Sequence, residues 1–296
     1  MKSIMIKTIL LIVIVAITFN WSNAQINLKM TEKKIKIRNN QVEINYYQRG
    51  KGDTTLLFLH GWCINKTYWN NQLSYFSKEY NVLAIDHAGF GKSIANRQNW
   101  TIEEYAEDVN SFIDSLQLKN VVLIGHSMSG EIMIQTATLN NPNIIGLVGV
   151  DNFKVLDVEF TPEQMKQMTD FFPLLQNDFK NSAPMYADMM MFHPLTSKEI
   201  KDRVKTDFAN SNAQIGYESL MNYMQYSMTD AQMLEKLNFP LNLINCDYFP
   251  TNENGLKNHC ENGYKVEMIT ESGHYPMIEK PTEFNLALEK VLTEMK

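Results

Sequence analysis

The sequence predicts an α/β fold in which a mostly parallel central sheet is covered by helices and carries an inserted helical cap. Short β-branched runs alternate with helical patterns along the chain, and this order is typical of a parallel sheet. The alternation stops between residues 152 and 238, where only helical spacings occur. The composition, 44% hydrophobic and 20% charged over 296 residues, is that of a globular chain and excludes disorder and fibres.

Six runs should form the centre of the sheet, because they are apolar without alternation, as strands covered on both faces are. Ahead of them, residues 34–37 and 42–47 alternate apolar and polar side chains and predict an antiparallel pair at one edge. Helical spacing predicts helices at 101–116, at 128–139 and from about 282 onwards, with a capping box formed by Thr101 and Glu104. The six central runs are 56–59, 82–85, 121–124, 144–150, 241–244 and 266–269.

The cap is expected to span residues 152–238, and the core to comprise 25–151 and 239–296. The position of the cap between two strands favours a lid over a separate domain. Methionines recur in it, and their flexible side chains either fill a core or surround an apolar pocket. These are Met165, Met168, Met185, Met189, Met190, Met191, Met221, Met224, Met228 and Met233.

Residues 1–24 have the features of a cleaved secretory signal. Lys2 and Lys7 precede an apolar run at 9–19, and small residues follow up to Ala24. We therefore expect an exported protein, periplasmic or secreted, with no membrane span after cleavage. The alternative is an uncleaved N-terminal anchor, although the run is short for a bilayer.

The formal net charge of −6 gives no basic field, so a nucleic-acid partner is not expected. No two of the six histidines have the spacing of metal ligands, and no metal or other cofactor is predicted. Cys63, Cys246 and Cys260 are an odd number of cysteines. Buried free thiols are the favoured interpretation, with a Cys246–Cys260 bridge as the alternative.

Residues 125–130 read Gly-His-Ser-Met-Ser-Gly between a predicted strand and a predicted helix. Such a tight turn holds its apex residue, Ser127, in a strained backbone conformation and lifts the side chain above the sheet. A serine hydroxyl is a poor nucleophile unless a base and an anion-stabilising pocket accompany it. The alternatives are that Ser127 only caps the helix, or that Ser129 is the nucleophile.

With this turn the chain resembles the α/β-hydrolase superfamily, whose nucleophile elbow is G-x-S-x-G. Ser129 stands where the second glycine is usual, and we expect this small residue to be tolerated. The His-Gly-Trp-Cys run at 60–63 is similar to the family's HG-x loop. The resemblance implies that the backbone N–H groups of Trp62 and Met128 stabilise an oxyanion. Residues 86–93 look like the family's D-x-x-G-x-G-x-S turn, in which Asp86 should brace the loop.

The resemblance also implies that His274, after the last predicted strand, is the base that accepts the proton of Ser127. The carboxylate that orients the histidine is harder to assign from the sequence. Alignment on Pro250 puts Phe249 where the family usually has its carboxylate, and Asp247 lies two residues too early. Some family members take the acid from the end of the strand after the elbow helix, where this chain has Asp151. We therefore predict Asp151, with Asp247 as the alternative acid.

Together these residues predict a serine hydrolase that cleaves a small apolar ester or related acyl compound through an acyl-enzyme. The same superfamily includes lactonases, C–C bond hydrolases, thioesterases and cofactor-free haloperoxidases, and the fold does not choose among them. A serine at the elbow argues against epoxide hydrolases and haloalkane dehalogenases, which use an aspartate there. A non-catalytic ligand-binding protein is the alternative from another class. The oligomeric state is not indicated.

Overall fold

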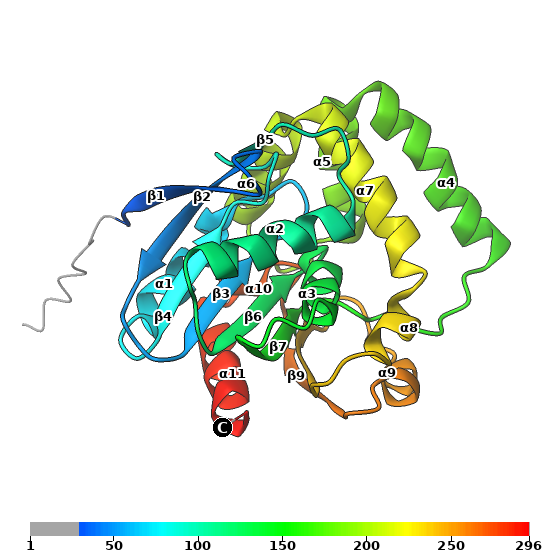
Figure 1. Ribbon diagram of the computed structural model, residues 1–296. Helices are drawn as coiled ribbons and strands as arrows, with labels where there is room; N and C mark the ends of the chain where they lie inside the picture. Colours follow the sequence, from blue (N-terminus) through cyan, green and yellow to red (C-terminus); the bar gives the residue numbers. More distant parts are fainter. Residues whose placement is uncertain (1–29, 296) are drawn as a thin grey trace, which may run out of the picture.

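The computed structural model describes residues 30–295, and the predicted signal segment lies outside this range. Within it the strands form one nine-stranded sheet in the order β1-β2-β4-β3-β6-β7-β8-β9, with β5 paired to β2 (Figure 1). Pairing is parallel from β4 to β9 and antiparallel at the β1–β2 edge, which confirms the predicted fold class. The strands are β1 (Glu32–Ile37), β2 (Val42–Arg49), β3 (Thr55–Leu59), β4 (Asn81–Ile85), β5 (Ile94–Ala95), β6 (Val121–His126), β7 (Ile144–Val150), β8 (Leu241–Cys246) and β9 (Tyr264–Ile269).

Helices cover both faces of the sheet, with α1 and α11 on one face and α2 and α3 on the other (Figure 1). The helices outside the stretch between β7 and β8 are the short 3-10 helix η1 (Lys66–Trp69), α1 (Asn70–Phe76), α2 (Ile102–Ser115), α3 (Ser129–Thr138), α9 (Glu253–His259), α10 (Pro276–Glu279) and α11 (Pro281–Glu294). Thr101 caps α2 by accepting a hydrogen bond from the backbone of Glu104. The Glu104 side chain pairs with Arg38 and Arg97 instead of returning to Thr101, so the predicted capping box is only half formed.

Burial separates the central strands from the last one. Strands β3, β6 and β8 are buried along their whole length, as their apolar sequences predict. Strand β9 is partly exposed, and Met268 keeps 45% of its surface accessible. The prediction that residues 266–269 lie at the centre of the sheet is wrong, because β9 is an edge strand paired only with β8.

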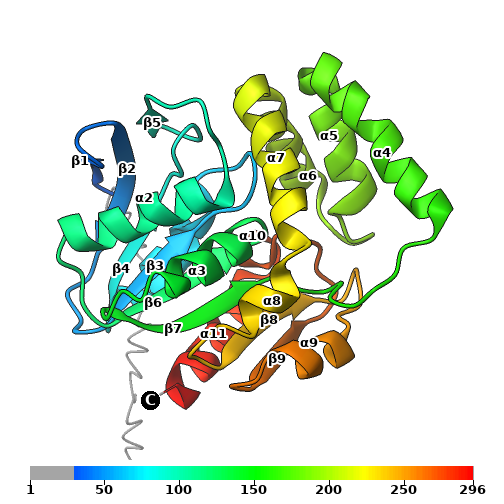
Figure 2. The same ribbon diagram turned by 45° about the vertical axis from the view of Figure 1, so that its right-hand side comes forward.

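Five helices, called here the inserted helices, lie between β7 and β8. They gather on one side of the sheet, where α7 packs against α2 and α3 (Figure 2). Some of their methionines are buried, such as Met233 in α8, and others are exposed, such as Met189 in α5. No helix within residues 30–295 combines the length and apolarity needed to cross a bilayer. The inserted helices are α4 (Pro162–Asn177), α5 (Phe179–Met190), α6 (Lys198–Asn210), α7 (Ala213–Ser227) and α8 (Asp230–Leu234).

The three cysteines are buried free thiols, so Cys246 and Cys260 are not bridged. Burial raises the pKa of each thiol above its ordinary value, to about 11 for Cys260. The thiols are therefore protonated at neutral pH and pack as small apolar side chains.

Candidate active site

Ser127 forms the turn between β6 and α3 with a left-handed backbone, at a φ of 53°. Such a conformation is costly for a residue other than glycine, so the surroundings must hold it. The Ser127 N–H donates to the Val150 carbonyl at 3.0 Å, and the Ser127 carbonyl accepts from the Gly130 N–H at 2.7 Å. The residues on both sides of Ser127 are buried while Ser127 itself is partly exposed. The turn therefore leaves the Ser127 side chain partly accessible at the carboxyl end of β6.

Close packing around this turn explains its glycines. A Cβ atom on Gly125 would lie 2.2 Å from the Ser129 carbonyl oxygen, and one on Gly130 would lie 2.4 Å from the Asn152 side-chain nitrogen. Ser129 fits because its hydroxyl donates to the His60 carbonyl at 2.5 Å. The need for glycine thus falls at position 130, one place later than in the G-x-S-x-G pattern. Ser129 is completely buried in α3, which argues against it as a nucleophile.

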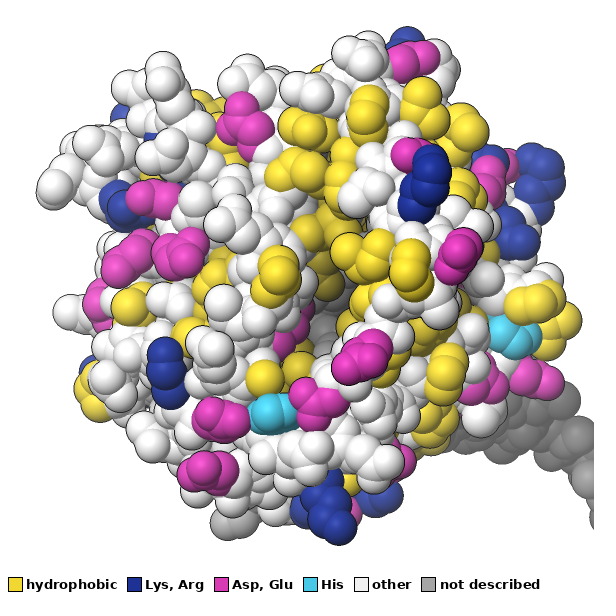
Figure 3. Space-filling view, turned by 90° about the vertical axis from the view of Figure 1, so that its right-hand side faces the viewer, with side chains coloured by type: hydrophobic (Ala, Val, Ile, Leu, Met, Phe, Trp, Pro, Cys, Tyr) yellow, Lys and Arg dark blue, Asp and Glu magenta, His cyan; other side chains and the backbone are white. Residues whose placement is uncertain are grey.

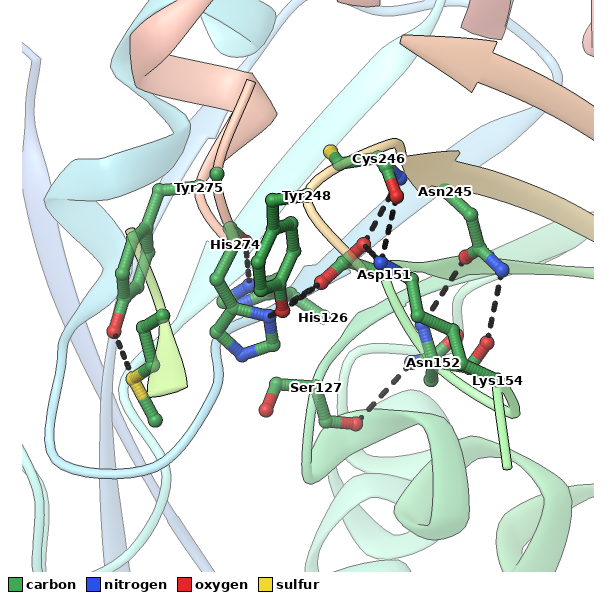
Figure 4. Close-up of polar contacts among 12 residues, drawn as sticks. His126, Ser127, Asp151, Asn152, Lys154, Asn245, Cys246, Tyr248, His274 and Tyr275 are labelled. Atoms are coloured by element: carbon green, nitrogen blue, oxygen red, sulfur yellow. Dashed lines mark hydrogen bonds and ion pairs between the residues drawn. The ribbon is translucent and has the colours of Figure 1, made fainter. Parts of the chain in front are cut away.

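His274 and Asp151 meet directly above the sheet (Figure 4). Asp151 follows β7, and its Oδ2 lies 2.6 Å from Nδ1 of His274, which comes from the loop after β9. The loop is anchored because the His274 N–H donates to the Met191 carbonyl and the His274 carbonyl lies 2.7 Å from His126 Nε2. In Figure 4 the other ring nitrogen of His274 points toward the Ser127 side chain. The three side chains are thus in series in the order serine, imidazole, carboxylate.

Asp247 does not contact the imidazole ring. Its carboxylate accepts hydrogen bonds from the backbone N–H groups of Glu271 and Ser272, at 3.0 and 3.4 Å. Asp247 therefore braces the loop that leads to His274. Phe249 stands in the position usual for the acid and is 40% exposed. The carboxylate that contacts the imidazole is that of Asp151.

Asp151 has hydrogen-bond donors on both carboxylate oxygens. Its Oδ1 accepts from the Cys246 N–H at 3.0 Å and lies 2.5 Å from Lys154 Nζ, while Oδ2 also accepts from the Tyr248 hydroxyl at 2.8 Å. Burial alone would raise the pKa of Asp151, but the hydrogen bond from His274 and the charge of Lys154 together hold it well below its usual range. Asp151 is therefore ionised. Sequence reasoning missed Lys154 and Tyr248, since neither belongs to a recognisable motif.

The backbone groups predicted to hold an oxyanion lie next to Ser127. A Cβ atom on Gly61 would come within 3.0 Å of the Ser127 Cβ, which shows how closely the 60–63 loop approaches the elbow. Within residues 30–295, neither the Trp62 N–H nor the Met128 N–H donates to a protein acceptor. The Trp62 indole instead donates to the Gly216 carbonyl in α7 at 2.7 Å. The Trp62 ring thus contacts α7, one of the inserted helices, while its backbone N–H is free of protein acceptors within residues 30–295.

Three other histidines support the site without contacting Ser127 by their ring nitrogens. Burial lowers the pKa of His60 to about 4 and that of His87 and His126 well below the ordinary value, so all three are neutral. His60 Nε2 accepts from the His87 N–H at 2.9 Å. Asp86 braces its loop as predicted, because it accepts from the backbone of Lys92 and pairs with Lys66 at 2.7 Å.

The face of the molecule on the side of the inserted helices is hollowed, and hydrophobic side chains line much of the hollow (Figure 3). The inserted helices contribute exposed apolar side chains to the surface of this part of the chain. They include Met165, Leu174, Met185, Met189 and Met190. No group of three His, Cys, Asp or Glu side chains in the described part of the chain is arranged to hold a metal ion.

A parallel sheet with a strained serine after β6 and an imidazole–carboxylate contact above it defines the α/β-hydrolase class of protein. Comparison with known families agrees with this geometry. A family model described as alpha/beta hydrolase fold matches residues 54–234. The chain therefore belongs to the alpha/beta hydrolase fold family.

Its relatives include hydrolases, esterases and peroxidases. The chain is 30% identical to a bifunctional esterase/perhydrolase of Acinetobacter calcoaceticus over 154 residues. The matched stretch covers 50% of this chain and 55% of that protein. The chain is 29% identical over 123 residues to the (E)-2-((N-methylformamido)methylene)succinate hydrolase of Acinetobacter baylyi, covering 42% and 46%. The chain thus spans about half the length of these curated relatives. A thermophilic esterase from Thermogutta terrifontis has a similar fold, with a TM-score of 0.75 at 19% identity over 90% of this chain and 99% of that one.

Proposed function

We propose that the protein is a serine hydrolase that cleaves small apolar carboxylic esters or related acyl compounds through an acyl-enzyme. The observation that carries the proposal is the series of Ser127, His274 and Asp151 beside two backbone N–H groups without protein acceptors. Relatives that are themselves hydrolases and esterases support the same reaction class.

In the proposed reaction the Ser127 oxygen attacks the carbonyl carbon while His274 takes the hydroxyl proton. The negative charge that develops on the carbonyl oxygen is stabilised by the N–H groups of Trp62 and Met128, each contributing about 3–4 kcal/mol. His274 then gives the proton to the departing alkoxide, which leaves as an alcohol. Water, activated by His274, attacks the acyl-enzyme, and the carboxylic acid is released. Asp151 holds the ring and stabilises the imidazolium throughout.

The apolar surface of the inserted helices favours apolar acyl groups over charged ones. The test is hydrolysis of p-nitrophenyl esters of increasing chain length, and of lactones, by the purified protein. Turnover should be lost in Ser127→Ala, and a fluorophosphonate probe should label the wild type but not this variant. No turnover together with no labelling of Ser127 would overturn the proposal in favour of a ligand-binding protein.

We also propose that the protein is exported to the periplasm or secreted. The motif at residues 1–24 supports this, with Lys2 and Lys7 before an apolar run and a small-residue site. Cell fractionation with mass spectrometry of the N-terminus tests it. A mature chain that begins after Ala24 outside the cytoplasm is expected, and an uncleaved chain that pellets with membranes would favour the anchor.

A further inference from the structure

A buried ammonium group lies on the far side of the Asp151 carboxylate from His274. Lys154 Nζ is 2.5 Å from Oδ1, whereas the His274 ring contacts Oδ2. The same Nζ donates to the Cys246 carbonyl at 2.8 Å and lies 4.3 Å from the centroid of the Tyr248 ring. Lys154 is only 8% exposed, so its charge has a carboxylate, a carbonyl and an aromatic face as partners in place of water.

Tyr248 closes this arrangement on the other oxygen. The Tyr248 hydroxyl donates to Asp151 Oδ2 at 2.8 Å, and the hydroxyl oxygen lies 3.1 Å from His274 Nδ1 (Figure 4). Burial and the Asp151 charge raise the pKa of Tyr248 well above its ordinary value, so the hydroxyl keeps its proton and acts as a donor. The phenol therefore fixes the relative positions of the carboxylate and the imidazole.

The Lys154 ammonium bears on the position of the Asp151 carboxylate. A triad carboxylate normally holds the imidazole ring and stabilises the imidazolium that forms when the serine loses its proton. Here Lys154 holds Oδ1 on the side away from the ring, which leaves Oδ2 to His274 and Tyr248.

We propose that Lys154 and Tyr248 are positioning residues of the active site, which hold the Asp151 carboxylate in place against the His274 ring. This inference rests on the proposed hydrolase function for its kinetic readout. It concerns residues that act on His274 through Asp151 and do not touch the substrate.

The main test is Lys154→Met, which removes the charge and shortens the side chain by one atom. It should lower kcat about tenfold and leave KM unchanged, because Asp151 Oδ1 loses this partner and the carboxylate can turn away from the ring. The NMR signal of the His274 Nδ1 proton, followed on histidine-labelled protein and assigned with His274→Gln, should move as its bond to Asp151 changes. Lys66→Met is the matched control, because it breaks the buried Lys66–Asp86 pair away from the ring and should leave this signal in place.

Tyr248→Phe is a second variant that does not depend on Lys154→Met folding. It should lower kcat about tenfold and leave KM unchanged, since it disturbs only the alignment of the base. Tyr68→Phe removes an equivalent bond to a carboxylate, from Tyr68 to Asp207 at 2.7 Å, and should keep kcat.

The outcomes separate this inference from the proposed function. A wild type without ester hydrolysis, in which the His274 Nδ1 signal still moves in Lys154→Met, would overturn the function and support the role of Lys154. A wild type that hydrolyses esters, with kcat and the Nδ1 signal unchanged in Lys154→Met, would overturn the role of Lys154. If Lys154→Met does not fold, an unchanged kcat in Tyr248→Phe would overturn the positioning network.

Discussion

Two groups of buried carboxyls differ in the donors around them. Asp151 receives donors on both oxygens, and its pKa is lowered although burial alone would raise it. Glu131 in α3 and Asp230 in α8 are also buried, but Glu131 Oε2 and Asp230 Oδ1 have no hydrogen-bond partner within residues 30–295. Burial, aided by Asp230, raises the pKa of Glu131, and burial raises that of Asp230 to about 8. Since burial is common to both, the available donors decide which carboxyl is charged.

The largest effect is expected from removing the charge of Asp151, whose carboxylate has hydrogen-bond donors on both oxygens. Asp151→Asn keeps the shape of the side chain but removes the negative charge that orients the His274 ring and stabilises an imidazolium. By analogy with other serine triads, kcat on an ester substrate should fall about 10³- to 10⁴-fold. Steady-state kinetics with p-nitrophenyl esters measures the loss.

Asp247→Asn is the control for this substitution, because Asp247 bonds only backbone N–H groups of the loop before His274. Its kcat should fall less than about tenfold. An equal loss in both variants would mean that loop position, and not the carboxylate beside the ring, limits the rate.

Removing one carboxyl of Glu131 and Asp230, each of which has an oxygen without a hydrogen-bond partner within residues 30–295, should increase the stability of the protein. Acids with raised pKa values take up protons on folding, so the free energy of unfolding should decrease as pH rises from about 4 to about 8. Glu131→Gln supplies an amide donor to Asp230 and should stabilise the protein by about 1–3 kcal/mol at pH 8, with a smaller gain at pH 5.

Urea unfolding at the two pH values measures this gain. Asp230→Asn is the reciprocal variant and should flatten the pH dependence in the same way. A loss of stability at pH 8 in both variants would contradict the raised pKa values, because it would mean that both carboxyls are ionised and held by hydrogen-bond donors in the folded protein.

The smallest effect is expected at His259, whose ion pairs with two carboxylates lie at the surface. His259 in α9 lies 2.9 Å from Asp157 and 2.8 Å from Glu235, which flank the inserted helices on the two sides. The hydrogen bonds to Glu235 and Asp157 raise the pKa of His259, so the stabilisation is full below about pH 6.5 and disappears as pH rises through the raised value.

His259→Gln should therefore lower the Tm at pH 5.5 by about 2 °C or less, and by still less at pH 8.5 or in high salt. Differential scanning fluorimetry of both proteins across this range is sufficient. A larger loss at pH 8.5 than at pH 5.5 would contradict the assigned charge of His259.

Much of the site could be predicted from local pattern. The strand, the tight turn and the helix around Ser127 are contiguous in the chain, and the loop of His274 is recognised by its place after the last strand. The choice between Asp151 and Asp247 was harder, because both follow strands whose carboxyl ends lie side by side in the sheet. Lys154 and Tyr248 were not predicted, since a lysine and a tyrosine that contact a buried carboxylate have no sequence signature apart from those contacts.

The order of strands and helices along the chain, and the predictions of Ser127 as nucleophile and His274 as base, follow from residues close together in the chain, because backbone propensity and turn chemistry act over a few positions. The charge of Asp151 depends on folding instead. It arises where His274, 123 positions away, and Tyr248, 97 positions away, bring donors to a buried carboxylate that strand pairing has placed beside them. Desolvation and hydrogen bonding both depend on such distant contacts, so spacing along the chain cannot reveal which buried acids keep their charge.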